Sequence, residues 1–395
     1  MKIIIGTESF PPNISGVAVA AHFLAKSLAD EGHQVWVIAP SPNRTQFEEE
    51  DPSGFRIFRL RSVGNPFRKG FRATLWPGKA VWHLVGHIKP DVIHLHDPVA
   101  ICKNLLKAGR AQGIPVVVTN HFSLEYLLSY VPSLKPLHPI FRRLLSRHLA
   151  RFYNRCDYVL CPTETVKESL RAMGVTSPIE AISNGVAVER FYAYQPPQAL
   201  RLKYHLPDNR LVLYVGRIDR DKSLEVLLEA IPRVVQETNA HFVLVGDGTV
   251  LGKLKSSVEK NSLERFVTFL GSIDHDSESL PGIYQISSVL VIPSAVESQS
   301  IVTLEAMASG LPIVAARGGA LPELVKDGVN GYLFEPQDAR AAADGLIGIL
   351  KDSALARKMG RESLKTVAAH RTEESFRKTK RTYEEVIQKQ KHRHS

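Results

Sequence analysis

One stretch sets the pattern for the whole chain: Pro293-Ser-Ala-Val-Glu-Ser-Gln-Ser-Ile-Val-Thr-Leu-Glu-Ala-Met-Ala-Ser-Gly310. Before it, Ser287-Ser-Val-Leu-Val-Ile-Pro293 is a short apolar run, typical of a parallel strand with both faces covered. Within it, apolar residues recur at helical spacing, and Gly310 and Pro312 are stop signals. The stretch therefore predicts the carboxyl end of a buried strand, a polar loop and then a helix.

The stretch carries two acids, Glu297 in the predicted loop and Glu305 in the predicted helix. A continuous helix would place their carboxylates about 12 Å apart and on different faces, so they cannot form a close acid/base pair. With Glu297 in the loop, the helix begins with free backbone N–H groups around Gln299, Ser300 and Ile301. These groups can hold a phosphate anion. Glu305 can then reach the hydroxyls of an attached ribose. The alternative is that Glu297 only caps the helix and Glu305 is solvated.

Length and composition indicate a globular chain of two domains. The 395 residues are 44% hydrophobic and 23% charged, and no apolar run approaches the length of a membrane span. The apolar start, Met1-Lys-Ile-Ile-Ile-Gly6, is too short for a secretory segment, so we expect a cytoplasmic protein. Three cysteines without a C-x-x-C pair predict neither a disulfide framework nor a zinc site. The formal net charge of +10 indicates an acidic partner, which could be a nucleotide phosphate, a nucleic acid or an anionic membrane surface.

The first half opens as a doubly wound sheet. Lys2–Gly6 reads as a strand, a loop leads to Gly16, an amphipathic helix ends at Gly32, and Gln34–Ala39 is the next strand. Gly16 stands where a ligand could approach the backbone closely, although a glycine needed only for the turn is an equal alternative. The G-x-G-x-x-G fingerprint is absent, which argues against a nicotinamide or flavin cofactor.

Two further strands each end in histidine. Asp91–Asp97 contains His94 and His96, which point to the same face, and 115–122 ends near His121. Ligands of open α/β sheets bind at the carboxyl ends of the strands, so His96 and especially His121 are candidates for chemistry. No third ligand of suitable type is evident, so a metal site is not favoured.

Two segments of this half mix basic and aromatic side chains, namely Phe55–Arg72 and Lys135–Arg155. The second contains six Lys or Arg and no acid, as expected for a basic amphipathic helix on an anionic bilayer. The competing interpretations are a solvated loop for the first segment and a packed core helix with a charged outer face for the second.

A second cycle of strands and helices follows a proline-containing hinge at 194–198. Strand 210–216 precedes Arg217 and Lys222, which stand where a diphosphate could be neutralised. Asp219 and Asp221 spell D-x-D, which can hold a divalent metal, but ion pairs with Arg217 or its neighbour Arg220 are favoured.

Taken together, these residues resemble the retaining GT-B glycosyltransferases of family four along essentially the whole chain. The most specific part is Glu297 and Glu305 at their spacing, followed by Ala-Met-Ala-x-Gly310; the corroborating motifs are Ser15-Gly16, Asn120-His121, Asn184-Gly-Val186, Gly216-Arg217 with Lys222, and Gly318-Gly319. The chain looks most like lipid-directed members such as diacylglycerol glucosyltransferases, which carry Glu-Thr-Gln-Gly where this chain has Glu297-Ser-Gln-Ser300.

The resemblance implies two Rossmann-like domains facing across a cleft, 1–193 on the acceptor side and 194–370 on the nucleotide-sugar side. A C-terminal helix, 371–395, would pack back on the first domain. Arg217 and Lys222 would bind the diphosphate and Glu305 the ribose. Glu297 and the loop amides would hold the sugar.

In the first domain, the resemblance implies that Gly16 lets the backbone approach the phosphates and that His121 hydrogen-bonds the transferred sugar. No metal or cofactor would be required, because the cations and the helix start supply the electrostatic stabilisation.

The expected activity is transfer of a hexose, with glucose preferred, from a UDP-sugar to a membrane lipid such as diacylglycerol, with an α-linkage. The alternative is a glycosyltransferase acting on a soluble or polysaccharide acceptor. For either acceptor the expected location is the cytoplasm, with peripheral attachment to the inner face of the cell membrane as a further option. Basic charge alone supports a nucleic-acid-binding protein, and no helix-turn-helix, RRM or zinc-finger pattern accompanies it.

Overall fold

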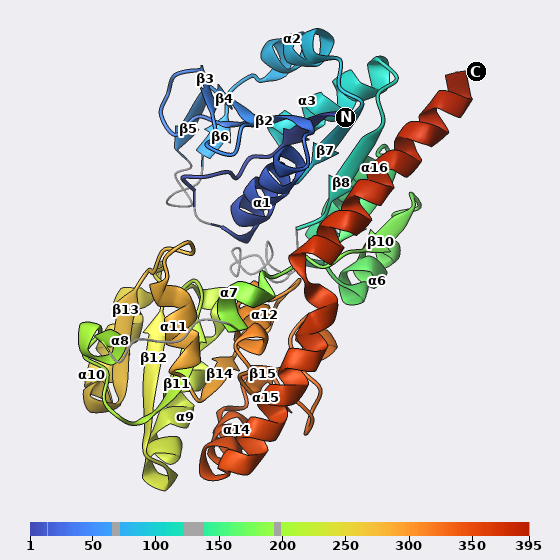
Figure 1. The fold of residues 1–395 in the computed structure, drawn as a ribbon. Coiled ribbons are helices and arrows are strands. Elements are labelled where there is room, and N and C mark those ends of the chain that lie inside the picture. Colours follow the sequence, from blue (N-terminus) through green and yellow to red (C-terminus); the bar gives the residue numbers. More distant parts are fainter. Residues whose placement is uncertain (14, 65–71, 122–137, 193–198, 395) are drawn as a thin grey trace. The chain divides into compact units, whose positions relative to one another are not determined.

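The computed structural model describes residues 1–13, 15–64, 72–121, 138–192 and 199–394. These residues divide into two compact units. Unit 1 comprises Met1–Ser183 and Ser375–Ser395, and unit 2 comprises Asn184–Glu374. Each unit is an α/β domain with its own sheet (Figure 1).

Unit 1 is built on an eight-stranded sheet of order β10-β9-β8-β7-β1-β2-β4-β3. Neighbouring strands in this sheet pair in parallel, except β3 and β4, which pair antiparallel. The strands of this sheet are β1 (Lys2–Gly6), β2 (Gln34–Pro40), β3 (Phe47–Glu50), β4 (Arg56–Leu60), β7 (Val92–Leu95), β8 (Val116–Thr119), β9 (Tyr158–Cys161) and β10 (Ile179–Ala181). A separate antiparallel pair is formed by β5 (Ser62–Gly64) and β6 (Arg72–Thr74).

Helices cover both faces of this sheet. They are α1 (Gly16–Asp30), α2 (Gly78–Ile88), α3 (Ala100–Ala111), α5 (His138–Tyr153), α6 (Glu164–Ala172) and α16 (Thr372–His394). Ile3 and Ile5 face the core shared with α1 and α16, whereas Ile4 faces the core under α2 and α3. A strand buried on both faces must be apolar throughout, which explains the Ile3–Ile5 run.

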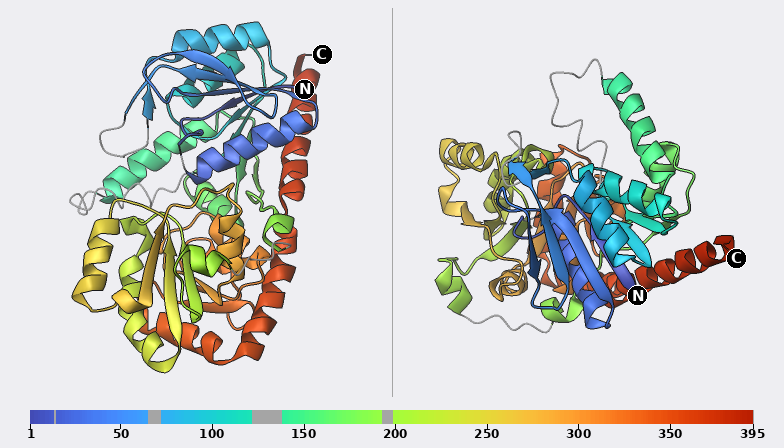
Figure 2. Two further views of the ribbon diagram at one scale, coloured as in Figure 1. Left: turned by 60° about the vertical axis from the view of Figure 1, so that its left-hand side comes forward. Right: turned by 90° about the horizontal axis from the view of Figure 1, so that it is seen from above.

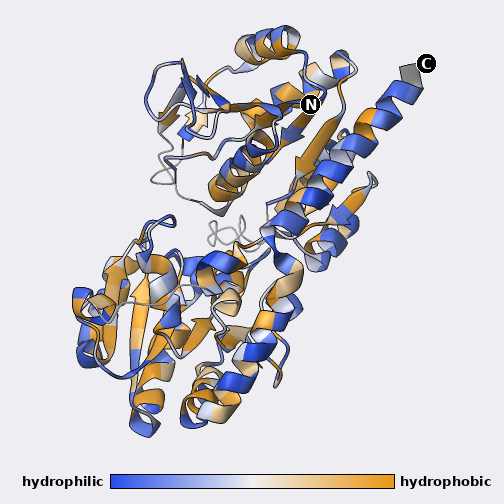
Figure 3. Cartoon of the chain, in the orientation of Figure 1, coloured by the Kyte–Doolittle hydropathy of each residue, from blue (hydrophilic) through white to orange (hydrophobic). Residues whose placement is uncertain are grey.

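The long C-terminal helix α16 is mostly hydrophilic (Figure 3) and is held in unit 1 by a few anchors. Tyr383 and Val386 are buried in the core beside α1. Lys380 donates to Glu31 at 2.6 Å, and the Tyr383 hydroxyl contacts Nδ1 of His94. The end of the chain therefore supports the strand that carries His94.

Unit 2 is built on a six-stranded, fully parallel sheet of order β13-β12-β11-β14-β15-β16. Its strands are β11 (Arg210–Val215), β12 (Ala240–Val245), β13 (Val267–Gly271), β14 (Val289–Ile292), β15 (Ile313–Ala316) and β16 (Gly331–Phe334). Its helices are α7 (Val188–Tyr192), α8 (Ala199–Lys203), α9 (Leu224–Glu237), α10 (Leu251–Lys260), α11 (Ser279–Gln285), α12 (Ile301–Ala308), α13 (Leu321–Leu324), α14 (Ala339–Lys351) and α15 (Ser353–Val367).

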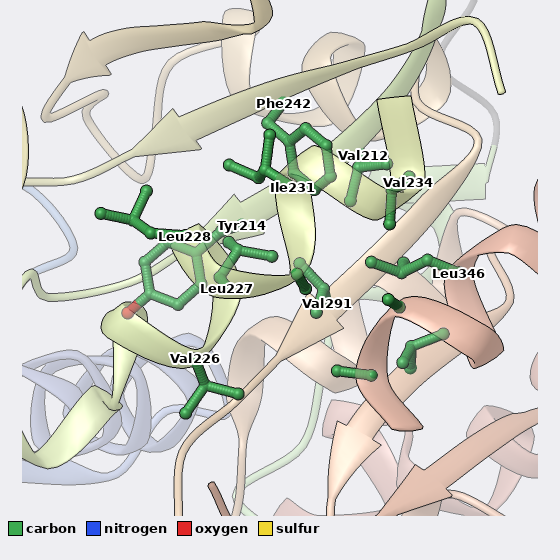
Figure 4. Packing of buried hydrophobic residues seen from close by; sticks show 14 of the residues in the cluster. Val212, Tyr214, Val226, Leu227, Leu228, Ile231, Val234, Phe242, Val291 and Leu346 are labelled. Carbon is green, nitrogen blue, oxygen red and sulfur yellow. The ribbon is translucent and has the colours of Figure 1, made fainter. Parts of the chain in front are cut away.

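Two apolar cores sandwich this second sheet. In one of them, α9 and α14 pack against the sheet through residues such as Ile231, Phe242 and Leu346 (Figure 4). In the other, α11 and α12 pack against the opposite face, with Leu304 and Tyr284 fully buried. The expected fold class is confirmed, because both units are α/β domains with parallel sheets. In the eight- and six-stranded sheets, the parallel arrangement also puts the carboxyl ends of all strands except β3 at the same edge of their sheet, where side chains from several loops can meet.

Candidate active site

Two loops meet at the carboxyl edge of the unit 2 sheet. Strands β11 and β14 are adjacent and parallel, with Val212 opposite Val289. The segments that follow these strands therefore emerge side by side. The Ser294 hydroxyl links them by donating to the carbonyl oxygen of Asp221 at 3.2 Å. Residues far apart in sequence are brought together here by the order of the strands.

Lys222 and Glu297 form an ion pair across these two loops. Nζ of Lys222 donates to Oε1 of Glu297 at 2.6 Å, and the two side chains are only 16% and 13% exposed. The helix start is capped by Ser300, so Glu297 is not the hydrogen-bonding cap of this helix. An ammonium group has three hydrogens, so Lys222 can contact an anion while it keeps this partner.

Arg217 lies directly after β11 and pairs with both acids of the D-x-D motif. Its guanidinium donates to Asp219 and, at 2.9 Å, to Oδ2 of Asp221. The other oxygen of Asp219 accepts from the backbone N–H and the hydroxyl of Thr249 at 2.8 and 2.7 Å. The ion-pair interpretation of this motif is thus confirmed for Arg217. Within the described ranges, no three His, Cys, Asp or Glu side chains gather as a metal site.

The glycine pair Gly318-Gly319 shapes the loop that carries Glu297. A Cβ atom on Gly318 would collide with the backbone of Ser294 and Ala295, and one on Gly319 would collide with the backbone of Glu297. The next residue, Ala320, donates its N–H to the Glu297 carbonyl oxygen at 2.8 Å. Only residues without a side chain allow this close approach, which holds the Glu297 backbone in place.

The start of helix α12 is ordered by its own polar side chains. The Ser300 hydroxyl oxygen accepts from the N–H of Thr303 at 3.3 Å. Gln299 is nearly buried, and its Oε1 accepts from the N–H of Asn184 at 2.7 Å. No hydrogen bond joins the backbone N–H of Ser300 or Ile301 to another described residue. The first turn thus presents backbone donors beside the Lys222–Glu297 pair, as an anion site requires.

Glu305 is buried, with 2% of its surface exposed, so the alternative in which it is a solvated residue is wrong. Its Oε2 accepts from the Tyr284 hydroxyl at 2.6 Å, and its Oε1 lies 3.0 Å from Nε2 of His275. The hydrogen bond to Glu305 raises the pKa of His275 above its ordinary value. The carboxylate therefore acts on its surroundings partly through His275, whose side chain is 40% exposed.

His275 was missed as a site residue by sequence reasoning. It lies in the segment between β13 and α11, and Arg190 of α7 fixes that segment by donating to the carbonyl oxygens of His275 and Ser277. The only available signal was the position of the segment after the carboxyl end of a strand. A lone histidine in a loop has no distinguishing spacing.

In unit 1, Gly16 is the first residue of α1. Ser15 caps this helix by accepting from the N–H of Ala18 at 3.1 Å. Gly16 does not have a left-handed φ, and a Cβ atom built on it meets no atom within 4 Å. Neither turn geometry nor packing among the described residues therefore requires a glycine. Its open surroundings keep the close-approach interpretation as a proposal.

His121 follows β8 at the carboxyl edge of the unit 1 sheet. Its Nε2 lies 3.0 Å from Nδ1 of His96. The preceding residue, Asn120, is buried and donates to the Tyr153 hydroxyl at 2.6 Å. Burial lowers the pKa of His121 to about 4, so the ring is neutral near pH 7.

A pair of carboxyl groups lies at the same edge and was not singled out from the sequence. Oδ2 of Asp97 accepts from the Glu8 N–H at 2.6 Å. The Glu8 carboxyl accepts from the Thr74 hydroxyl at 2.8 Å and from the N–H of Ile101 at 2.9 Å. Burial, followed by the charge of Asp97, raises the pKa of Glu8 to about 7. Acids placed singly after two different strands give no motif that spacing alone could identify.

Helix α5 is a packed core helix in its second half only. Leu149 and Phe152 in its second half are buried in the core, whereas Ile140, Phe141 and Leu144 in its first half are 59%, 45% and 59% exposed. In the right-hand view of Figure 2, α5 (green) lies next to α3, which it contacts through Lys103 and His148. Of the other basic aromatic segment, Phe55–Arg72, residues 65–71 lie outside the described part.

Comparisons with known proteins place the chain in a family. Residues 14–190 match the family described as Glycosyltransferase Family 4, and residues 199–366 match the one described as Glycosyl transferases group 1. The alpha-monoglucosyldiacylglycerol synthase of Acholeplasma laidlawii is 29% identical over 86% of both chains. The phosphatidyl-myo-inositol mannosyltransferase of Mycobacterium tuberculosis is 30% identical over 84% of this chain and 83% of that one.

A solved structure agrees with these relatives. The sucrose-phosphate synthase from Thermosynechococcus elongatus superposes with a TM-score of 0.78 at 25% identity, and the match covers 98% of each chain. With the parallel sheets of both units and the loops at their carboxyl edges, this protein belongs to the family 4 glycosyltransferases and has the GT-B fold.

Proposed function

We propose that this glycosyltransferase moves a hexose from a UDP-sugar to a membrane lipid such as diacylglycerol, and that the anomeric configuration is retained. Glucose is the proposed hexose. The observation that carries the donor part is the cluster at the edge of the unit 2 sheet. There Lys222, Arg217 and the backbone donors of the α12 start stand within two adjoining loops. A sugar diphosphate needs this combination of cations and amide donors.

The proposed division of labour follows from these contacts. Lys222 and Arg217 bind the diphosphate and stabilise the charge that develops on the leaving group. The backbone of Ser300 and Ile301 contacts a phosphate oxygen, and Glu297, held against Lys222, accepts hydrogen bonds from the sugar. In this proposal the protein's own cations do the electrostatic work that a metal ion does in other transferases.

The nucleoside end is assigned to the buried Glu305. Its carboxylate oxygens can each accept a second hydrogen bond besides those from Tyr284 and His275. We propose that ribose hydroxyls donate to it and that the partly exposed His275 ring borders the same subsite. Gly16 and His121 are proposed to serve the reaction from unit 1, Gly16 by close approach of its backbone to the phosphates and His121 by a hydrogen bond to the transferred sugar.

The lipid part of the proposal is supported by the first half of α5. Three large apolar side chains stand exposed on it, and the whole helix carries Arg142, Arg143 and Arg147 but no acidic residue. This pattern is typical of a helix that lies on an anionic bilayer, with its apolar side chains in the acyl boundary. No helix among the described residues is long and apolar enough to cross a membrane. Peripheral attachment through α5 is therefore the proposed route to a lipid acceptor.

The test is transfer of labelled glucose from UDP-glucose to vesicles that contain diacylglycerol and an anionic lipid. We expect a glucolipid whose anomeric proton identifies the α-linkage by NMR. Leu144→Glu should reduce both vesicle binding and transfer, while Val329→Glu, at an exposed apolar site of unit 2, should change neither. Hydrolysis without transfer for every lipid tried would contradict the lipid proposal.

A soluble or polysaccharide acceptor is the alternative. The similar structure is named for making sucrose phosphate, and the second half of α5 is an ordinary core helix. If the alternative holds, transfer to a soluble acceptor will proceed without vesicles and will be unaffected by Leu144→Glu.

A further inference from the structure

Three histidines of unit 1 form a connected series that leads from helix α16 to the sheet edge. His94 and His96 stack with ring centroids 4.7 Å apart and planes 16° apart. His96 then meets His121 through a nitrogen–nitrogen contact of 3.0 Å. His94 and His96 are almost completely buried, whereas His121 is half-buried. The series thus ends at the residue proposed to contact the sugar.

The contact between His96 and His121 is an in-plane hydrogen bond. Their ring planes are only 5° apart, and their centroids are 5.2 Å apart. The centroid separation equals the nitrogen–nitrogen distance plus about one centroid-to-nitrogen distance for each ring. The two centroids and the two nitrogens therefore lie nearly on one line. Nδ1 of His96 and Nε2 of His121 must therefore point at each other, and a hydrogen bond between them needs one proton.

All three rings are neutral, so this proton has only two possible places. Burial lowers the pKa of His94 to about 3, that of His121 to about 4, and that of His96 well below its ordinary value. A neutral imidazole has one donor nitrogen and one acceptor nitrogen. Either His96 donates from Nδ1 to His121, or His121 donates from Nε2 to His96. The two arrangements leave opposite tautomers on His121.

The surroundings of His96 distinguish the two arrangements. Its Nε2 is buried and has no hydrogen-bond partner among the described residues. If His96 accepted the bond, its own proton would sit on Nε2 as a buried N–H without an acceptor. If His96 donates, Nε2 carries only an unused lone pair. Buried donors without partners are rarer than under-satisfied acceptors, so donation from His96 is favoured.

His94 does not impose a choice of its own. Its Nδ1 contacts the Tyr383 hydroxyl, and its Nε2 lies 2.7 Å from the hydroxyl of Thr119. Hydroxyl groups both donate and accept, so His94 is satisfied in either tautomer. The His94 ring, which Tyr383 and Thr119 hold, stacks on His96, while the direction of the last hydrogen bond is set at His96.

We propose that His96 is a positioning residue that holds His121 in the Nδ1–H tautomer, so that His121 presents a hydrogen-bond donor to a substrate oxygen. Nδ1 of His121 makes no hydrogen bond to any other described residue. Unlike Nε2 of His96, it is not a buried atom that lacks a partner. A neutral donor held by its neighbour suits a sugar hydroxyl oxygen and excludes proton transfer by His121 as its role near pH 7. That substrate contact rests on the proposed function; the tautomer does not.

The first test reads the tautomer directly and needs no substrate. The full-length protein is labelled with ring-¹⁵N histidine, and two-bond ¹H–¹⁵N correlation spectra are recorded at pH 7.5, with His121→Asn used to assign the His121 signals. We expect a protonated Nδ1 and an unprotonated Nε2 on His121. A protonated Nε2 on His121 in the unsubstituted protein would overturn the proposal, whether or not the protein transfers glucose.

The second test uses a matched pair of variants at His96. Asn and Leu have nearly the same size, but only the Asn amide can donate a hydrogen bond from the position of Nδ1. His96→Asn should keep the Nδ1–H tautomer and stay within about threefold of the unsubstituted kcat, because the donor is retained. His96→Leu should lose the tautomer preference and lower kcat by about 10-fold to 10³-fold, the upper bound being the loss of a whole preorganised donor.

The Michaelis constant for the donor should change much less than kcat in His96→Leu, since the binding cluster of unit 2 is untouched. Equal kcat values for the Asn and Leu variants would contradict a positioning role, because a merely structural histidine would be replaced equally well by either. Absence of glucosyl transfer in the unsubstituted protein, together with the Nδ1–H tautomer, would overturn the proposed function and leave the tautomer assignment standing.

Discussion

The ion pair between Lys222 and Glu297 gives the sharpest prediction. Replacing Lys222 with Met removes a charge that is proposed to face the developing negative charge of the leaving diphosphate. Loss of one preorganised electrostatic donor costs about 10² to 10³ in kcat, and we expect Lys222→Met to fall in that range. Arg220→Met is the matched control, because Arg220 lies with Lys222 in the short 3₁₀ helix η2 (Arg220–Lys222) and is exposed. Its kcat should stay within a few-fold of the unsubstituted value.

The same substitution should also destabilise the fold, by an amount that the geometry bounds. It leaves the carboxylate of Glu297, whose side chain is 13% exposed, without its 2.6 Å partner. Breaking a fully buried ion pair costs about 3–5 kcal/mol. Because both groups retain some contact with water, we expect about 1–3 kcal/mol. The measurement is the midpoint of urea unfolding, monitored by the fluorescence of the protein.

A double variant separates the two effects. In Lys222→Met/Glu297→Gln, the uncompensated charge is gone, so most of the lost stability should return. Activity should not return, because the cation proposed to face the diphosphate is still missing. Assays use UDP-glucose with vesicles and, separately, donor hydrolysis, so that the result does not depend on one acceptor. If Lys222→Met kept near-normal kcat, or if the double variant regained it, Lys222 would have no place in the donor site.

Three further predictions concern other parts of the chain. Burial raises the pKa of Glu8 from 4.5 to about 7, so the free energy of unfolding should fall as the pH rises through that window, by up to about 3 kcal/mol. Glu8→Gln should flatten this pH dependence in urea titrations, and an unchanged slope would refute the assignment. Glu305→Gln should lower the pKa of His275 in NMR titrations and raise the KM for the donor, since the carboxylate hydrogen bond is the largest cause of the raised value; an unaltered pKa would contradict it. Leu144→Glu should weaken binding to anionic vesicles by about tenfold or more in sedimentation assays, the loss expected for one leucine side chain, while Val329→Glu binds normally.

Much of the fold followed from local pattern. The apolar run ending at Pro293 became β14, and the segments starting at Lys2, Asp91 and Arg210 became β1, β7 and β11. Runs buried on both faces leave little ambiguity, because only a parallel sheet covered by helices accommodates them. The alternation of strands and helices, repeated after the hinge, then predicted two such units. The prediction of two α/β domains with parallel sheets was correct.

The details of the candidate site followed from sequence only in part. The spacing of Glu297 and Glu305 excluded a close acid/base pair, and Arg217 with Lys222 was placed at the end of a strand. The ion pair of Lys222 with Glu297 was not foreseen, because it depends on β11 and β14 being neighbours in the sheet although β12 and β13 lie between them in the sequence. The burial of Glu305 was open as well, since helical periodicity does not tell which polar residue packs against a tyrosine.

The chain by itself determined which segments are strands and helices, where each strand ends, and which residues carry charge at those ends. These properties depend on hydrophobic periodicity and stop signals within short windows, so they can be read locally. Only the tertiary structure decided which loops meet, that His275 and Tyr284 enclose Glu305, and that His94, His96 and His121 form a series ending at one donor. Strand order and side-chain packing join residues separated by up to hundreds of positions, and no local pattern encodes that choice of neighbour.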